Sequence, residues 1–284
     1  MRVIAFFSRK GGCGKTTSCV NVSVALAEMG RRVLVVDLDS NACASRTFDR
    51  VGRIDNSIAA ALLGEKTLAE VIQPAGPQGV WVAPGAPDLS AIEKMEGMDD
   101  SRRVDETGHL SEIALLLEID KLGDEKFDYI LLDCPGGHPF VERMALLACA
   151  EVIVPTGLSV YDLYAATPTL QLILTARQVR GDGLPAFLGF LPNGASKSGV
   201  PQKMQATLDQ FSLPCFSPVR QSALLRSIAG MPQVEQRIIV LARPDNPAAV
   251  SYRQVAREID LGIEAARRLA IGPVAVTADA QRAL

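Results

Sequence analysis

The residues with the clearest chemical purpose lie in a glycine-rich stretch near the N-terminus. The stretch reads Ser-Arg-Lys-Gly-Gly-Cys-Gly-Lys-Thr-Thr over residues 8–17. An apolar run at residues 3–7 predicts a buried strand before it, and apolar residues at helical spacing over residues 18–30 predict a helix after it. Strand, glycine-rich loop and helix in this order are typical of a phosphate-binding loop. Glycines let backbone N–H groups turn towards phosphate oxygens, and the helix directs the positive end of its dipole at the same anion.

Three polar side chains at the end of this stretch have expected partners in a bound Mg²⁺–nucleotide. Lys15 is expected to reach the β- and γ-phosphates, and the Thr16 hydroxyl is expected to bind Mg²⁺. Thr17 is placed to contact the α-phosphate. Backbone groups supply the remaining contacts, from Gly11, Gly12, Cys13 and Gly14. A plain glycine turn between a strand and a helix is the alternative, and it does not explain the Gly-Lys-Thr-Thr sequence.

Carboxylates follow two further apolar runs of the chain. Residues 32–38 and 127–133 predict buried strands, the first with Asp37 near its end and Asp39 just after it, the second ending at Asp133. Doubly wound sheets bind ligands at the carboxyl ends of their parallel strands. Asp133 is therefore expected to hold Mg²⁺ through a water molecule, as a Walker B aspartate does. Asp37 and Asp39 lie at the same edge and are candidates for the site. The alternative is that they are solvated acids that cap the following helix.

One departure from the ordinary phosphate-loop pattern points to a family. The pattern G-x-x-x-x-G-K-[ST] has glycine at position 9, where this chain has Arg9 followed by Lys10. The stretch Lys-Gly-Gly-Cys-Gly-Lys-Thr-Thr resembles the deviant Walker A motif of the ParA/MinD family of P-loop ATPases, and the resemblance extends over residues 1–270. It implies ATP and Mg²⁺ as cofactors, and a Lys10 that reaches across a dimer interface to the partner's nucleotide. A surface lysine beside the loop is the alternative.

The resemblance also implies roles for the acids after the second strand. Residues 37–41 are similar to the family's D-x-D-P-Q-x-N stretch, with Ser40 and Asn41 in place of proline and glutamine. The match implies that Asp39 orients the attacking water, and that Asp37 is either a magnesium-shell acid or a structural one. The implied catalytic residues are Lys10, Lys15 and Asp39.

Two more positions match the family near the predicted nucleotide. Residues 133–137, Asp-Cys-Pro-Gly-Gly, resemble the switch that follows the Walker B strand, which implies that the Gly136 N–H contacts the γ-phosphate. Asn193 follows a predicted strand at residues 186–191, where the family has an asparagine that hydrogen-bonds adenine. A turn-forming asparagine beside Gly194 is an equally good interpretation.

Strands and helices alternate along the chain, without an internal repeat, a low-complexity stretch or a recognisable linker. This alternation predicts one doubly wound α/β domain, with a mainly parallel sheet and helices on both faces. The ATPase domain is expected over residues 1–272, followed by a flexible tail at residues 273–284.

The composition of the 284 residues is ordinary for a globular protein, with 48% apolar and 21% charged residues and a net charge of −3. No apolar run reaches the length of about 18 residues that predicts a membrane-spanning helix, and the N-terminus lacks a signal-peptide pattern. We therefore expect a cytoplasmic protein. The six cysteines lack metal-binding spacing, and with two histidines in the chain a zinc site is not expected.

Arginines near the C-terminus match positions where ParA proteins carry basic residues for DNA. Arg220 and Arg226 are expected at the start of a short helix after the last strand, and Arg253 and Arg257 are expected one turn apart on the terminal helix. Residues 219–284 contain nine arginines and six acids, a balance of +3. Solvated or ion-paired surface arginines are the alternative.

The resemblance as a whole implies a ParA-type positioning ATPase. Such a protein forms a homodimer with ATP and binds DNA non-specifically, which places it on the nucleoid. A partner protein on the cargo, which is a plasmid, a chromosome locus or a protein organelle, stimulates hydrolysis and release. No membrane partner is expected, because the last twelve residues carry one arginine and no large apolar face.

Two interpretations from other functional classes stay open. A MinD-like membrane-cycling ATPase needs a C-terminal amphipathic basic helix to bind lipid. A metabolic relative, such as a nitrogenase iron-protein type reductase or a dethiobiotin-synthetase type ligase, uses the same ATP site differently. Cys134 and Cys149 do not match the cluster pattern of the reductase. The ligase interpretation predicts a small-molecule pocket and no affinity for DNA.

Overall fold

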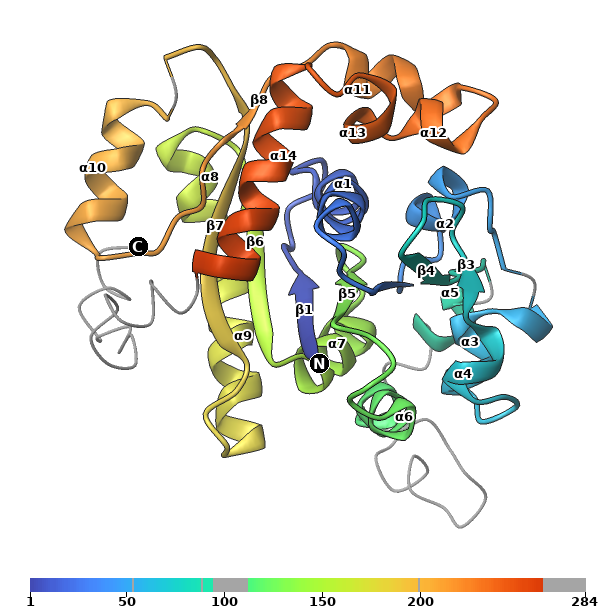
Figure 1. Ribbon diagram of the computed structural model, residues 1–284. Coiled ribbons are helices and arrows are strands. Elements are labelled where there is room, and N and C mark those ends of the chain that lie inside the picture. The colour runs from blue at the N-terminus through green and yellow to red at the C-terminus, as the bar shows by residue number, and fades with distance from the viewer. Residues whose placement is uncertain (53, 88, 94–111, 199, 263–284) are drawn as a thin grey trace.

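A mainly parallel sheet forms the centre of the chain, of which the computed structural model describes residues 1–52, 54–87, 89–93, 112–198 and 200–262. Eight strands of these residues follow the order β3-β4-β2-β5-β1-β6-β7-β8, and only the β3–β4 pair is antiparallel (Figure 1). The strands are β1 Arg2–Phe6, β2 Val33–Asp37, β3 Gln73–Pro74, β4 Val80–Ala83, β5 Tyr129–Asp133, β6 Glu151–Thr156, β7 Ala186–Ala195 and β8 Val219–Arg220. The predicted doubly wound α/β fold is confirmed.

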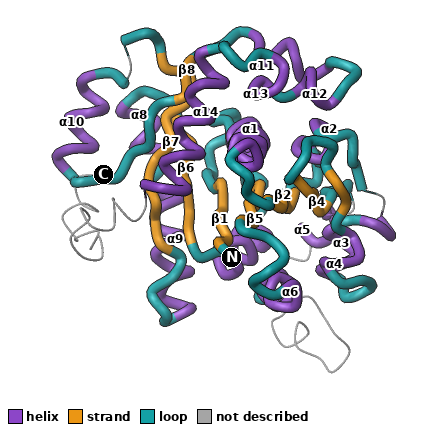
Figure 2. The backbone as a smooth tube through the Cα atoms, in the orientation of Figure 1, coloured by secondary structure: helices purple, strands orange, loops and turns teal. Residues whose placement is uncertain are grey.

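Helices cover both faces of this sheet, as the tube in Figure 2 shows. One face carries α1 Lys15–Glu28, α2 Cys43–Thr47, α11 Leu224–Ser227, η3 Ile228–Gly230, α12 Val234–Arg237, α13 Ile239–Ala242, α14 Pro247–Arg257 and the π-helical η4 Glu258–Gly262. The other face carries α3 Ile58–Leu62, α4 Leu68–Val71, α5 Leu89–Glu93, α6 Ala114–Leu122, α7 Pro139–Ala148, α8 Val160–Ala165, α9 Thr167–Arg180 and α10 Gln202–Gln210. A short 3-10 turn, η1, spans Ile54–Asn56.

The central strands bury both of their faces, which explains their continuous apolar sequences. In β1, Ile4 and Phe6 pack in the layer that contains α1 and α14, whereas Val3 and Ala5 pack in the layer that contains α7. A strand covered on both sides has no solvated face, so its sequence shows no alternation of polar and apolar residues. This burial makes the sheet a rigid support for the loops at its edge.

The register of the central strands brings the two predicted acidic strand ends together. Asp133 on β5 is paired with Phe6 on β1 and with Asp37 on β2. The phosphate loop leaves the sheet directly after β1. The loop and both carboxylates therefore meet at the carboxyl edge of the sheet, where doubly wound folds bind their ligands.

Residues 160–180 form two consecutive helices, α8 and α9, and α9 has a proline in its first turn, where the missing N–H carries no cost. The last strand is β8 at Val219–Arg220, and Cys215 forms an isolated bridge with Phe190. The predicted tail lies outside the described residues. Among those that are described, no helix has both the length and the apolar content needed to cross a membrane.

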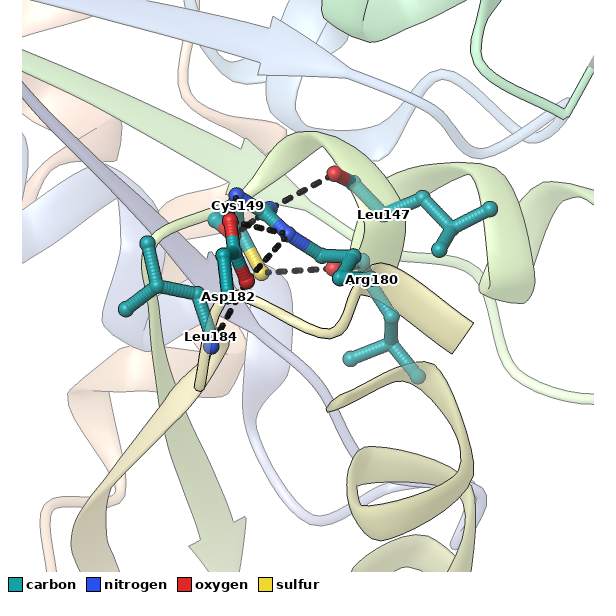
Figure 3. Close-up of polar contacts among 6 residues, drawn as sticks. Leu147, Cys149, Arg180, Asp182 and Leu184 are labelled. Atoms are coloured by element: carbon teal, nitrogen blue, oxygen red, sulfur yellow. Dashed lines mark hydrogen bonds and ion pairs between the residues drawn. The ribbon is translucent and has the colours of Figure 1, made fainter. Parts of the chain in front are cut away.

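Arg180 joins the C-terminal end of α9 to the C-terminal end of α7 (Figure 3). Its Nη1 donates to the carbonyl oxygens of Leu147 and Cys149, both at 2.7 Å, at the C-terminal end of α7. The same guanidinium pairs with Asp182, which also accepts from the Leu184 N–H. A cation at this position satisfies carbonyl groups that the end of a helix leaves without partners.

Candidate functional site

The phosphate loop runs from the end of β1 to the first residue of α1. Gly14 caps α1 with a φ of +92°, which only glycine adopts without strain. The helix has no side-chain cap and no acidic residue in its first turn, so its N-terminal N–H groups face outward for an anion. A Cβ at Gly14 would lie 2.9 Å from Asn193 Nδ2, so packing as well as backbone geometry requires glycine here.

Lys15 lies between the phosphate loop and the loop after β5. Its Nζ donates to the carbonyl oxygens of Ser8, at 2.9 Å, and Lys10, at 3.3 Å. It also lies 3.1 Å from the position that a Cβ on Gly136 would occupy. The fold thus brings together Lys15 and Gly136, which the sequence assigned to the same γ-phosphate. Because Gly136 has no side chain, the Lys15 ammonium group can lie this close to the loop after β5.

Asp133 is a fully buried carboxylate without a hydrogen-bond donor of good geometry among the described residues, for either oxygen. Burial raises its pKa well above the ordinary value, the Asp37 carboxylate adds to the shift, and Thr16 acts in the opposite direction. Buried carboxylates without donors are rare unless a cation binds them. Mg²⁺ prefers oxygen ligands and retains several waters, so Asp133 and the Thr16 hydroxyl fit it.

Asp37, in contrast, has both of its carboxylate oxygens engaged by hydrogen bonds from the protein. Its Oδ2 accepts from the Ser45 N–H, at 2.8 Å, and the Ser45 hydroxyl, at 2.6 Å, and its Oδ1 accepts from the Asp39 N–H, at 3.2 Å. Burial raises the pKa of Asp37 to about 6, although the bonds from Ser45 lower it. These contacts fit the structural role, and the metal contact of Asp37 stays a prediction. Sequence reasoning did not anticipate Ser45.

Asp39 follows Asp37 in a turn that orients its carboxylate. Its Oδ1 accepts from the backbone N–H of Asn41, at 2.8 Å, and from the Asn41 side-chain amide, at 2.9 Å. Asn41 is a departure from the family stretch, and here it holds the acid in place. The arrangement allows Asp39 to orient water, which stays a prediction.

Lys10 has its side-chain contact outside the phosphate loop. Its ammonium group pairs with Asp162 on α8, and the lysine side chain is 44% exposed. Asp162 also closes a capping box with Ser159, accepting from the Ser159 N–H at 2.9 Å. Burial alone would raise the pKa of Asp162, but the hydrogen bonds from Lys10 and Ser159 lower it. Sequence reasoning missed Asp162, although the Ser-x-x-Asp spacing is a capping signal.

Asn193 lies against the phosphate loop, on β7. Its Nδ2 donates to the Cys13 carbonyl oxygen at 2.8 Å and to the Ser18 hydroxyl at 3.3 Å. Cys13 itself is buried, and its Sγ donates to the Lys10 carbonyl oxygen at 3.1 Å. The predicted contact between Asn193 and adenine is not tested by these bonds. They do show that Asn193 supports the loop.

The four predicted DNA-binding arginines differ in their surroundings. Arg220 is not on a helix, as was expected, but in β8, and its guanidinium donates to the Ser196 carbonyl oxygen. Arg253 pairs with Glu28 on α1 through two hydrogen bonds of 2.6 and 2.9 Å. These two side chains hold elements of the fold together.

The other two predicted arginines are exposed. Arg226 on α11 and Arg257 at the end of α14 have no ion pair or side-chain hydrogen bond to a described residue. A guanidinium group without an acidic partner has its N–H donors available to bind phosphate. DNA binding by all four arginines stays a prediction.

A cavity of about 380 Å³ adjoins the nucleotide site, and sequence reasoning did not find it. It lies between α1, α2 and the α11–α12 segment. The residues that matter for its chemistry are Thr16, Thr17, Cys43, Arg46, Ile228 and Arg237. Thr16 and Thr17 connect this cavity to the magnesium and α-phosphate positions predicted for them.

Residues 1–182 of the chain match the protein family described as "AAA domain". The chain belongs to the ParA/MinD family of deviant Walker A P-loop ATPases. The chromosome partitioning protein ParA of Myxococcus xanthus is 30% identical over 163 residues, which cover 57% of this chain and 54% of that protein. The aligned region thus spans about half of that ParA.

Two solved structures resemble the chain over almost its whole length. The septum site-determining protein MinD of Pyrococcus horikoshii OT3, complexed with Mg-ADP, has a TM-score of 0.71 and 28% identity, covering 92% of this chain and 97% of that one. Cobyrinic acid a,c-diamide synthase of Mycobacterium smegmatis, with bound ADP and magnesium, has a TM-score of 0.73 and 26% identity, covering 92% and 96%. The predicted cofactors ATP and Mg²⁺ are confirmed, and their binding by the residues described above stays a prediction.

Proposed function

We propose that this protein is a ParA-type ATPase that dimerises on ATP, binds DNA without sequence preference, and positions a plasmid, a chromosome locus or a protein organelle. A cargo-bound partner protein would stimulate hydrolysis and so release the ATPase from the nucleoid. The observation that carries the proposal is the placement of Lys10. It belongs to the phosphate loop, yet its ammonium group pairs with Asp162 on α8, and its side chain is partly exposed. A lysine so placed is available to a second copy of the chain.

The chemistry requires mainly positioning and charge neutralisation, as phosphoryl transfer does in general. Lys15 and the N-terminal N–H groups of α1 bind the phosphates, while Thr16 and Asp133 hold the magnesium ion that neutralises their charge. Asp39 orients the attacking water. Lys10 of a second copy adds a cation at the transferred phosphate. Hydrolysis then depends on dimerisation, so that ATP stabilises the dimer and hydrolysis dissolves it.

Non-specific DNA binding is proposed for the exposed arginines on the α11 and α14 side of the sheet. Arg226 and Arg257 have no acidic partner among the described residues, whereas Arg220 and Arg253 contribute as parts of the framework. A dimer doubles such a patch. DNA binding should therefore require ATP, ignore sequence and weaken steeply with salt, because each phosphate contact releases counterions.

The test measures binding to a random DNA duplex with ATP, with ADP and without nucleotide. We expect binding with ATP only, and loss of binding in Arg226→Glu combined with Arg257→Glu while the ATP dimer persists. The matched control is Arg177→Glu combined with Arg50→Glu, which puts the same charge change on α9 and beside β3. Equal DNA affinity with ATP and ADP, or no binding at low salt, contradicts the proposal.

A metabolic ligase is the second candidate, and the likeness to cobyrinic acid a,c-diamide synthase favours it. The cavity of about 380 Å³ beside Thr16 and Thr17 is the place where such an enzyme would bind its small-molecule substrate. This candidate predicts ATP binding without any DNA affinity. The same DNA assay therefore separates the two functions. Binding to anionic lipid vesicles with ATP, in place of DNA, would instead indicate a MinD-like membrane cycle.

A further inference from the structure

Arg9 occupies the position where the ordinary phosphate-loop pattern has glycine, and its contacts lead away from the nucleotide. Its backbone N–H donates to the Thr169 hydroxyl on α9 at 3.1 Å. Its Nε lies 3.4 Å from Glu142 Oε2 on α7. The Arg9 side chain is 41% exposed, whereas that of Glu142 is fully buried. The phosphate loop thus places a cation over a buried carboxylate.

Glu142 joins two loops through its two carboxylate oxygens. Oε1 accepts a hydrogen bond from the Gly137 N–H at 2.8 Å. Oε2 has no hydrogen-bond donor of good geometry in the described part of the chain, and Arg9 is its ion-pair partner there. Cations and N–H donors compensate a buried carboxylate for the hydration that it loses. Loss of Arg9 should therefore change how Glu142 holds the Gly137 N–H, although Arg9 and Gly137 do not bond each other.

The loop that contains Gly137 packs on the phosphate loop. A Cβ on Gly136 would lie 3.1 Å from Lys15 Nζ and 3.8 Å from the Arg9 carbonyl oxygen. Gly137 has a φ of +89°, in the left-handed region that favours glycine. The peptide between Gly136 and Gly137 is therefore fixed from two sides. Glu142 accepts a hydrogen bond from the Gly137 N–H, and the phosphate loop packs closely against Gly136.

We propose that Glu142 is a positioning residue for ATP hydrolysis, which orients the Gly136–Gly137 peptide, and that Arg9 holds the Glu142 carboxylate in place through their ion pair. The proposal rests on the ATPase function proposed above. Gly136 is thereby fixed on its C-terminal side, and its own N–H, on the preceding peptide, is the donor predicted for the γ-phosphate. A donor held in place before the reaction needs no reorganisation when charge develops on the γ-phosphate. Glu142 acts through Gly137, so its removal should slow the chemical step and leave nucleotide binding to Lys15 and the α1 N-terminus.

The test compares Glu142→Gln, Arg9→Met and the double variant in Mg·ATP hydrolysis and in binding of a fluorescent ATP analogue. Glutamine keeps the shape and one acceptor oxygen but removes the charge, and methionine keeps the unbranched chain of Arg9 without its cation. We expect each single variant to lower kcat about tenfold, the worth of one charge-assisted hydrogen bond, with an unchanged Kd for the analogue. The double variant should be no slower than either single one, because the two residues act as a unit.

Glu118→Gln is the matched control, because Glu118 on α6 is also a buried carboxylate. It accepts from the Leu68 N–H at 2.7 Å and pairs with Lys121, on elements that do not belong to the phosphate site. We expect it to lower the melting temperature as Glu142→Gln does and to leave kcat unchanged. If Glu142→Gln does not fold, Arg9→Met decides, because its side chain is partly exposed.

Several results would overturn the proposal. They are a wild-type kcat in Glu142→Gln or Arg9→Met, independent and multiplicative losses in the double variant, an ATP affinity that falls as much as kcat, and an equal kcat loss in Glu118→Gln. A wild-type protein that does not hydrolyse ATP under any condition contradicts the proposed function instead. The wild-type assay therefore distinguishes the two failures.

Discussion

At the scale of single residues, the site contains two neighbouring buried carboxylates with different hydrogen bonding to the described residues. Asp133 and Asp37 are neighbours on adjacent strands, and both are buried. Asp37 accepts three hydrogen bonds, whereas neither oxygen of Asp133 accepts one of good geometry from a described residue. An unsatisfied buried acceptor reduces stability, so its presence at the carboxyl end of β5 indicates that a cation completes it.

Asp133→Asn should stabilise the nucleotide-free protein and abolish Mg²⁺-dependent ATP binding. The substitution removes an uncompensated buried charge, worth about 1–3 kcal/mol in the free energy of unfolding. The pKa of Asp133 is raised in the folded wild type, so between the unfolded and the folded pKa the folded protein keeps the carboxyl proton that the unfolded chain has lost. The stability of the wild type therefore falls as the pH rises through this range. The gain of the variant should thus be larger at about pH 8 than at about pH 5. Urea denaturation at both pH values measures it.

Asp37→Asn is the control for this prediction, because it exchanges the same groups at the adjacent position. Asp37 uses its oxygens as acceptors for Ser45 and for the Asp39 N–H, so an amide in its place breaks at least one bond. We expect this variant to lose stability. A gain of stability in Asp37→Asn, or none in Asp133→Asn, contradicts the assignment of the two carboxylates.

Lys15→Ala and Asp39→Ala should separate nucleotide binding from hydrolysis. Lys15 is the cation of a phosphate site otherwise built from backbone groups, so its loss should abolish ATP binding. Asp39 contributes water orientation without holding phosphate, so Asp39→Ala should bind ATP, form the dimer and hydrolyse about 100-fold more slowly. Calorimetry and a phosphate-release assay measure the two properties. A wild-type rate in Asp39→Ala shows that another residue orients the water.

At the scale of secondary-structure elements, the chain uses arginines to attach helices to one another. Arg253 joins α14 to α1 through Glu28, and Figure 1 shows these two helices side by side over the sheet. Arg180 joins the end of α9 to the end of α7 (Figure 3). Both attachments lie between elements that are distant in sequence. They fix the helices that carry Lys15 and Glu142 on opposite faces of the sheet.

Arg180→Met should lower the free energy of unfolding by about 2–3 kcal/mol, because two carbonyl oxygens at the end of α7 lose a charged donor. The arginine side chain is 16% exposed, so water replaces the lost contacts only in part. Activity should be retained, since the site lies at the opposite edge of the sheet. Arg177→Met, three residues earlier on the same helix, is the control and should change stability little. A loss below that of the control would show that Arg180 contributes no net stability.

At the scale of the whole molecule, the arrangement of α8 beside the phosphate loop suggests how two copies would meet. Asp162 holds Lys10 at the surface, and Tyr161 on the same helix is 82% exposed. A second copy that approached this surface would have to compete with Asp162 for the lysine. The contact between Lys10 and Asp162 thus belongs to the single chain, and dimerisation on ATP would exchange it for a contact with phosphate.

Lys10→Ala should leave the nucleotide affinity of the single chain intact and remove the ATP dimer together with hydrolysis. A charge-assisted contact between lysine and phosphate is worth about 1.5–3 kcal/mol, and a symmetric dimer contains two. Analytical ultracentrifugation with a non-hydrolysable ATP analogue measures the dimer fraction. Lys203→Ala, an exposed lysine on α10, is the control. An unchanged dimer fraction in Lys10→Ala would rule out a lysine supplied by the second copy.

The sequence by itself determined the fold class and the phosphate side of the site. The strand, the glycine-rich loop and the helix are contiguous, so the positions of Gly14, Lys15 and Thr16 follow from the local order of elements. The buried strands were recognisable because both of their faces are apolar. Asp133 was recognisable as a strand-end acid for the same reason. Short elements such as β3, α2 and α10 carry too few apolar positions to produce a period, and they were not predicted.

Only the tertiary structure decided which distant residues support this site. Asn193 meets the Cys13 carbonyl, Asp162 meets Lys10, and Glu142 meets Arg9, each across more than a hundred residues of chain. No local period encodes such pairs, because they depend on the order of strands in the sheet and on the face to which each helix crosses. The same is true of Arg253, whose sequence position suggested DNA but whose neighbour in space is Glu28. An ionisable side chain takes its role from the charges around it, and those are set by the packing of the whole chain.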